Sequence, residues 1–235
     1  MGKNIYQQLD SPLARTPQLP PDNFLSGVSQ NGFRIVGQSN LIAAGLTADS
    51  LVVGIHISDD YDAGNLTHYK LPVYLERLEL TFTCIGAFTA PITAGRRLEI
   101  GMQTNPGSDL TFTGGLDLSV VEKMFGSNSQ PATLPRPIDG ADQCQIADTG
   151  ALTPSDSISP SLIGLLPLMH AGTAGAVVNK TWVFDAEEAT PFALSDRSVL
   201  VVRTPVSQAM DAAGTWQLTL EADFQYLPSS FYVAP

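Results

Sequence analysis

The sequence carries little charge, and very little of that charge is positive. Charged residues make up 15% of the 235 residues, with 12 lysines and arginines against 23 aspartates and glutamates, so the formal net charge is −11. The densest basic stretch is the pair Arg96-Arg97. A phosphate backbone or an anionic membrane surface repels such a chain. The composition therefore argues against nucleic acid and against membrane as partners.

Cysteine is equally scarce. Cys84 and Cys144 are the only two cysteines, and two cysteines do not make a disulfide framework. Cys84 ends an alternating segment, where a buried thiol behaves as a small apolar residue. Cys144 lies in the polar stretch DQCQIAD, for which we expect a loop. We predict reduced thiols, although the sequence leaves open whether the two cysteines pair.

Targeting signals are not apparent either. The first ten residues, MGKNIYQQLD, contain no apolar core, so we expect no signal peptide. The longest apolar stretch, residues 162–178, is interrupted by Pro167, by His170 and by several glycines. A membrane-spanning helix needs about 20 predominantly apolar residues in a row, so we expect no such helix here.

The clearest positive signal is a strict alternation over residues 215–226, TWQLTLEADFQY. Every even position is apolar and every odd position is polar. A period of two places one set of side chains on a buried face and the other set in water, as in an antiparallel strand. A long strand with one wet face is typical of a large sandwich or barrel.

Residues 73–85 predict a second long strand with one irregularity. Leu78, Leu80, Phe82 and Cys84 share one phase, whereas Val73 and Leu75 have the opposite phase. Either a bulge near Glu76 or a change in the covering layer would explain the switch. Further strands are predicted at residues 33–36, 51–57, 97–103, 109–113 and 180–186.

Two other segments have their own signatures. In residues 51–57 we expect Leu51, Val53, Ile55 and Ile57 on one face, with His56 opposite. The run SVLVV, residues 198–202, is apolar without interruption, as in a strand covered on both sides. We expect this run and residues 215–226 to form a closing hairpin with a long loop.

These patterns predict an all-β protein, an antiparallel two-sheet sandwich of jelly-roll type with seven to nine strands. Residues 116–125 are the only plausible helix of any length. The expected organisation is an extended proline-rich arm (1–28), a sandwich (29–228) and a short tail (229–235). Within the sandwich, residues 126–161 are rich in Pro, Ser, Gly and Asp, and we expect a long loop excursion there.

Candidate chemistry is weak throughout. Asp148-Thr149-Gly150-Ala151 matches the short motif of aspartic proteases, but its lead-in is polar, so we expect a plain turn. The acidic loop 59–65 offers oxygen ligands for calcium, yet its spacing departs from the EF-hand, and calcium binding stays open. No two of the three histidines have a metal-site spacing. We therefore predict no catalytic, cofactor or metal site, and no enzyme.

Apolar and aromatic residues outside the periodic strands are the best interface candidates, because an extended arm has no core of its own. Proline at four positions between 12 and 21 keeps this arm extended. The predicted interface residues are Ile5, Tyr6, Leu9, Leu13, Leu19, Phe231 and Tyr232.

The arm (1–23), the segment 198–228 and the tail (229–235) give the chain an architecture that resembles jelly-roll structural proteins of virus particles. The likeness is strongest to capsid decoration (cement) proteins and minor capsid proteins of tailed phages. It implies a homo-oligomer, most often a trimer, that binds the capsid protein of the same virion. It also implies synthesis in the host cytoplasm and a place on the capsid exterior, where the protein bridges neighbouring subunits.

Two other readings stay open at this point. The first alternative is a major or minor jelly-roll capsid protein, which would assemble into shells alone. A carbohydrate- or receptor-binding β-sandwich module would use the 126–161 excursion and the 59–65 loop. An enzyme ranks third, with Asp148 as the residue to substitute in a test.

Overall fold

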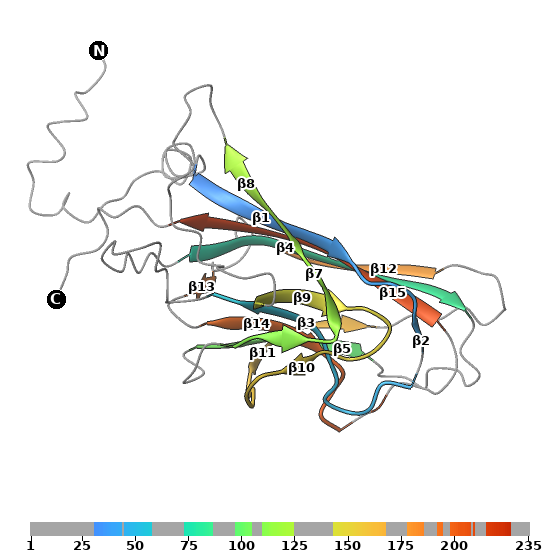
Figure 1. Cartoon of the computed structure of the whole chain (residues 1–235). Coiled ribbons are helices and arrows are strands. Elements are labelled where there is room, and N and C mark those ends of the chain that lie inside the picture. Colours follow the sequence, from blue (N-terminus) through green and yellow to red (C-terminus); the bar gives the residue numbers. More distant parts are fainter. Residues whose placement is uncertain are drawn as a thin grey trace, which may run out of the picture.

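The protein folds into two antiparallel β-sheets packed face to face (Figure 1). No α-helix occurs in the part of the chain that is described. The predicted all-β antiparallel sandwich is therefore confirmed. The computed structural model describes residues 31–43, 45–57, 73–86, 97–104, 110–124, 143–167, 178–185, 192–194, 198–207, 209 and 215–226.

The first sheet has seven strands. Its main path runs in the order β12-β4-β15-β1-β8, with β13 also beside β4 and β2 also beside β15. The strands are β1 (Asn31–Gln38), β2 (Ile42–Ala43), β4 (Val73–Gly86), β8 (Ser119–Met124), β12 (Val178–Asp185), β13 (Phe192–Leu194) and β15 (Thr215–Tyr226).

The second sheet has six strands in the order β11-β5-β14-β3-β9-β7, and a separate two-stranded ladder joins β10 to β6. The six strands are β3 (Leu51–His56), β5 (Arg97–Gln103), β7 (Gly115–Asp117), β9 (Cys144–Ala147), β11 (Ser161–Pro167) and β14 (Val199–Arg203). The ladder consists of β6 (Phe112–Thr113) and β10 (Thr153–Pro154).

Eight of these strands pair in a nested order along the chain. The first pairs with the last (β1 with β15), and inside them β3 pairs with β14, β4 with β12, and β5 with β11. All four pairs are antiparallel, as in one long hairpin. The additional pairings of β15 with β4 and of β14 with β5 roll this hairpin into two sheets.

Side chains from the facing surfaces of both sheets fill the interior. The apolar face of β15 is buried from Trp216 to Phe224, as its alternation predicts. Phe224 stacks on Phe33 with ring centroids 4.9 Å apart, and Trp216 lies 5.3 Å from Phe82. Aromatic pairs at such separations add to the stabilisation that burial provides.

The irregularity in β4 is a bulge at Glu76. Asp223 of β15 pairs with Arg77, and the next residue, Phe224, pairs with Leu75, so Glu76 is the extra residue. The bulge turns the strand so that Leu75 and Leu78 both point inward, and both are fully buried. Of the two explanations offered from the sequence, the bulge is the correct one.

A second bulge corrects the prediction for residues 51–57. Val202 pairs with Val53, and Arg203 pairs with Leu51, so Val52 is the extra residue of β3. Val53 and Ile55 face the main core as expected, but Leu51 points to the outer face of the sheet. The expected common face for all four residues is therefore wrong at Leu51.

β14 is covered on both faces, as its uninterrupted apolar run predicts. Leu200 and Val202 belong to the main core. Val199 and Val201 belong to a smaller cluster on the outer face of the second sheet, where the chain between β5 and β11 packs across it. We call this chain the insertion, and its described residues are 104, 110–124 and 143–160.

The predicted closing hairpin of 198–202 with 215–226 is wrong. β14 lies in the second sheet, between β5 and β3, whereas β15 lies in the first, between β4 and β1. The connection between them therefore crosses from one sheet to the other. The physical reason is the covering of each strand: both faces of β14 are apolar, and the described residues of the insertion cover the outer face of the second sheet.

The insertion also corrects two other expectations. Residues 116–125, expected as a helix, contain β7 and β8, which pair with β9 and β1 at the edges of the two sheets. The expected loop 126–161 includes β9 and β10, and Cys144 lies fully buried in β9 rather than in a loop. Pairing with distant strands decides these segments, and no local pattern reveals it.

Candidate functional site

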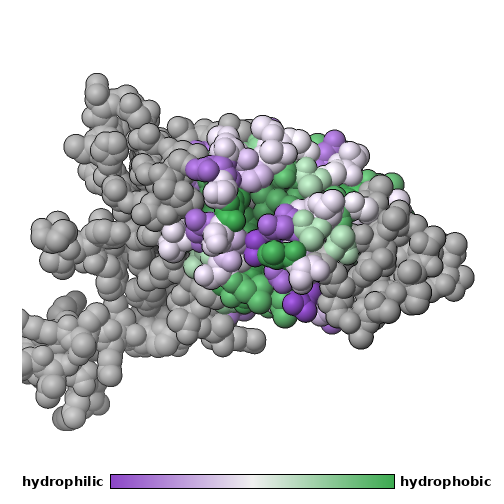
Figure 2. Space-filling view, turned by 90° about the horizontal axis from the view of Figure 1, so that it is seen from below, coloured by the Kyte–Doolittle hydropathy of each residue, from purple (hydrophilic) through white to green (hydrophobic). Residues whose placement is uncertain are grey.

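A cleft of about 400 Å³ lies on the outer face of the second sheet, between β3, β14 and the insertion. Figure 2 looks onto this side of the molecule and shows apolar patches between polar ones. The residues that line the cleft are Asp49, Ser50, Leu51, Ala151, Leu152, Pro154, Ser157, Ile158, Pro160, Val201 and Arg203.

The apolar wall of the cleft forms where the insertion meets the sheet. The bulge at Val52 turns Leu51 outward, and the Leu152 amide donates a hydrogen bond of 2.8 Å to the Leu51 carbonyl. Pro160 can lie on β5 because residue 101 is glycine: a Cβ there would come within 2.9 Å of the proline ring. The wall is therefore built from residues of the second sheet and residues of the insertion.

Arg203 forms the charged end of the cleft. Its Nη1 donates to Asp49 Oδ1 at 2.7 Å, and its Nε lies 3.7 Å from Glu99 Oε2. The Arg203 side chain is only 16% exposed, whereas the Asp49 side chain is 53% exposed. Arg97 lies 3.6 Å from Glu99, so the two arginines and two carboxylates balance in charge. The carboxylate of Asp49 is the most accessible charge of the four.

Two exposed leucines extend the apolar surface beyond the cleft. Leu162 is 55% exposed and Leu165 is 39% exposed, both on the edge strand β11. Leu165 pairs with Glu99, whose neighbours in β5 are buried in the core, so Leu165 and Glu99 share the outer face. The apolar surface thus continues from the cleft to the edge of the sheet.

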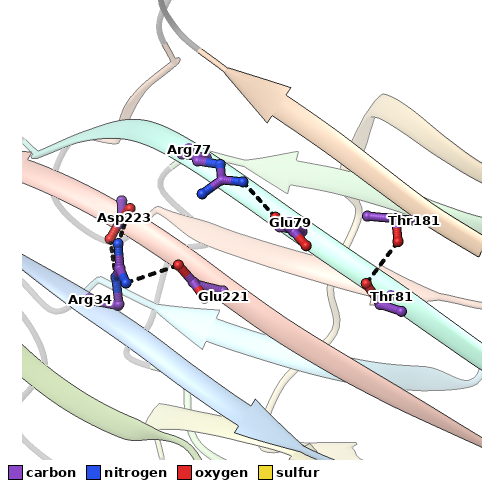
Figure 3. Close-up of polar contacts among 7 residues, drawn as sticks. All are labelled: Arg34, Arg77, Glu79, Thr81, Thr181, Glu221 and Asp223. Carbon is purple, nitrogen blue, oxygen red and sulfur yellow. Dashed lines mark hydrogen bonds and ion pairs between the residues drawn. The ribbon is translucent and has the colours of Figure 1, made fainter.

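Ion pairs lie on the outer face of the first sheet (Figure 3), beside the exposed side chains of Val121 and Val183. Arg34 binds Asp223 with two hydrogen bonds of 2.7 and 2.9 Å and lies 3.0 Å from Glu221. The hydrogen bond to Asp223 raises the pKa of the Arg34 guanidinium. Arg77 likewise binds Glu79 on its own strand. These charges are held by one another, so the face offers bound ion pairs rather than a reactive group.

The protease-like motif has a side-chain amide as the partner of its aspartate among the described residues. Residues 148–150 form a bend after β9, in agreement with the predicted turn. The Asp148 carboxylate accepts a hydrogen bond of 2.6 Å from the Asn40 side-chain amide, not from a second carboxyl group. The arrangement tethers the bend to the chain before β2.

Metal-binding chemistry is not found in the described ranges, where no group of three or more histidine, cysteine, aspartate and glutamate residues could hold an ion. His56 is buried in β3. The acidic loop 59–65, His68 and His170 lie outside the described residues. Whether the 59–65 loop binds calcium therefore stays open, as it did from the sequence.

The two cysteines are free and buried, in agreement with the prediction of reduced thiols. Cys84 is in the first sheet and Cys144 in the second. Burial raises the pKa of the Cys144 thiol well above its usual range, so this thiol stays protonated and unreactive in the folded state.

The predicted interface residues belong to the arm (1–28) and the tail (229–235), which lie outside the described residues, so these predictions stay untested. Conversely, sequence reasoning missed the cleft entirely. One available signal was the pair of prolines, Pro154 and Pro160, around the apolar Ile158 in a segment read as a loop. The contribution of Leu51 depends on a bulge that no local pattern indicates.

Comparison with known proteins does not assign the chain to a family. No protein-family model matches the chain, and no curated protein matches it. Within the described residues, no helix is long and apolar enough to cross a membrane.

Proposed function

We propose that this chain is a non-enzymatic structural protein of a virus particle, a capsid decoration (cement) protein that stabilises the shell by bridging neighbouring subunits. The observation that carries the proposal is the nested pairing of eight strands, from β1 with β15 to β5 with β11. A long hairpin rolled into two sheets is the arrangement of a jelly roll, a fold that recurs in viral capsids. We therefore propose the jelly-roll topology together with the function.

The interior supports a mechanical role. Large side chains such as Trp216, Phe33 and Phe82 fill the space between the sheets. A filled interior resists deformation, because close-packed cores have low compressibility and transmit strain. The acidic composition supports a place on the outside of a shell rather than against its genome.

In this proposal, the arm (1–28) and the tail (229–235) bind the neighbouring subunits of the shell. Ordering one residue of an arm on a partner costs about 1–2 kcal/mol of chain entropy. Burial of apolar side chains at roughly 25 cal/mol per Å² offsets that cost. The apolar residues of both segments, including Leu13, Tyr6 and Phe231, provide the surface for this burial. The proposed assembly is a homo-oligomer, with a trimer favoured, bound to the capsid protein of the same virion.

Deletion of residues 1–23 tests the proposal. We expect the full-length protein to be an oligomer, and the shortened protein to be folded but largely monomeric, because a proline-rich extended arm has no core of its own. The measurement is the solution mass by light scattering, with circular dichroism as the control for folding. A full-length protein that is monomeric, or a shortened protein that assembles and binds capsids normally, would contradict the proposal.

The cleft favours one alternative, a carbohydrate- or receptor-binding module, because jelly rolls also occur as lectin domains. Concave sites with apolar walls and a few polar groups are the usual form of a ligand site. Glycan and calcium titrations of the full-length protein by calorimetry would test this reading. The remaining variant, a major or minor capsid protein, predicts that the chain assembles into shells alone.

A further inference from the structure

We propose that the cleft beside Arg203 receives residues 13–15 of the N-terminal arm of a second copy of this chain. Leu13 would fill the apolar part of the cleft, and the Arg15 guanidinium would bind the Asp49 carboxylate. The proposal rests on the proposed function, in which arms join neighbouring subunits, and it names the surface that takes the arm.

The lining of the cleft is complementary to an occupant that carries one apolar group and one cationic group. Its wall is aliphatic, from Leu51, Leu152 and Ile158, and its rim carries the exposed carboxylate of Asp49. One oxygen of that carboxylate already accepts a hydrogen bond of 2.7 Å from Arg203 Nη1. A second guanidinium can bind the same carboxylate, because a carboxylate accepts up to about four hydrogen bonds.

The sequence Leu13-Ala14-Arg15 has the matching spacing. In an extended chain, residues two apart point to the same side and lie about 6.6 Å apart along the strand. Pro12 and Pro17 bracket this stretch and favour extended backbone on both sides of it. An extended segment therefore presents the leucine and the arginine together.

The charge and the length of the arm favour the arm of a second copy, rather than an entire acidic protein, as the occupant of the cleft. Residues 1–28 contain two bases, Lys3 and Arg15, and two acids, Asp10 and Asp22, so the net charge of −11 belongs to the remaining chain. Two acidic sandwiches repel one another, whereas a neutral arm approaches freely. The 15 residues between Arg15 and β1 (16–30) reach about 50 Å when extended, against about 46 Å for a 14-residue strand such as β4.

A disulfide trap tests the contact in the full chain. Leu13→Cys combined with Ser157→Cys places one thiol on the arm and one at the exposed rim of the cleft. The native Cys84 and Cys144 are buried and do not compete. After mild oxidation, we expect non-reducing electrophoresis to show inter-chain disulfides in this variant at about ten times the level of the controls.

Two controls make the trap specific. Leu13→Cys with Thr181→Cys moves the second thiol to the exposed outer face of the first sheet. Ile5→Cys with Ser157→Cys keeps the cleft thiol and moves the other along the arm. Cross-linking at equal levels in either control would overturn the proposal, and so would a disulfide formed within one chain, which would indicate an arm that folds back on its own subunit.

Charge reversal gives an independent readout. Arg15→Glu and Asp49→Lys should each raise the dissociation constant of the oligomer about tenfold, and the double variant should recover most of the loss. Additive losses without recovery would overturn the pairing. The outcomes separate the two proposals: a monomeric wild type contradicts the proposed function, whereas a wild-type oligomer that fails to cross-link contradicts only this docking site.

Discussion

At the scale of single residues, the contact between the insertion and the second sheet depends on the absence of a side chain. A Cβ on Gly54 would lie 2.5 Å from the Phe112 ring, which is fully buried against the sheet. Real Cβ atoms do not come so close to other atoms, so the ring would have to move. Phe112 is the residue of the insertion that packs on β3 at Gly54.

Gly54→Ala should therefore destabilise the fold by about 1–3 kcal/mol, the usual cost of overpacking a core. The measurement is urea denaturation followed by fluorescence or circular dichroism. Gly150→Ala is the matched control, because nothing lies within 4 Å of its Cβ position, and we expect a change below about 0.5 kcal/mol. Equal stability of the two variants would show that Phe112 does not pack on Gly54.

At the scale of elements, the bulge at Glu76 lets one strand bury two opposite phases of apolar residues. Because Glu76 is the extra residue, its deletion should leave Val73 and Leu75 in phase with Leu78, in a regular strand that keeps them buried. Deletion of the regularly paired Thr81 should instead put Leu80 and Phe82 in opposite phases, and exposure of two such fully buried side chains costs about 3–6 kcal/mol. Thermal or urea denaturation measures the loss.

The control for this deletion is Glu76→Gln, which keeps the length of the strand and the shape of the side chain. It should cost less than about 1 kcal/mol, because residue count and not charge sets the register. A deletion of Glu76 that costs as much stability as the deletion of Thr81 would contradict the bulge.

The same strand shows what a local pattern can reveal. The phase change between Leu75 and Leu78 was visible in the sequence, and so was the buried face of β15. The partner of a strand was not visible. β14 and β15 follow one another along the chain, and consecutive strands are neighbours about two-thirds of the time, yet here they lie in different sheets.

At the scale of the whole molecule, the two buried thiols, one in each sheet, can be used to measure how the sandwich opens. Cys84 lies in the first sheet and Cys144 in the second, and both belong to the main core. In the native state we expect neither thiol to react with a disulfide reagent within minutes, because both thiols are buried and inaccessible to the reagent. After addition of denaturant, both should react.

The rates distinguish cooperative opening from local opening. Single-thiol variants, Cys84→Ala and Cys144→Ala, should be labelled at the same rate in mild denaturant if the sandwich opens as one unit. Faster labelling of Cys144 alone would show that β9 and the insertion detach before the main sheets separate, which would contradict a single cooperative unit.

The sequence by itself determined the class of fold and the inward-facing residues of the long strands, because period-two alternation is a local consequence of strand geometry. It also indicated a core strand at residues 198–202 and the place of one bulge. Only the tertiary structure decided the sheet of each strand, the burial of Cys144, the strands at residues 115–124, and the cleft beside Arg203. These features depend on pairing between residues far apart along the chain, such as Leu51 with Leu152 or Arg203 with Asp49, and such pairing leaves no periodic mark in either segment.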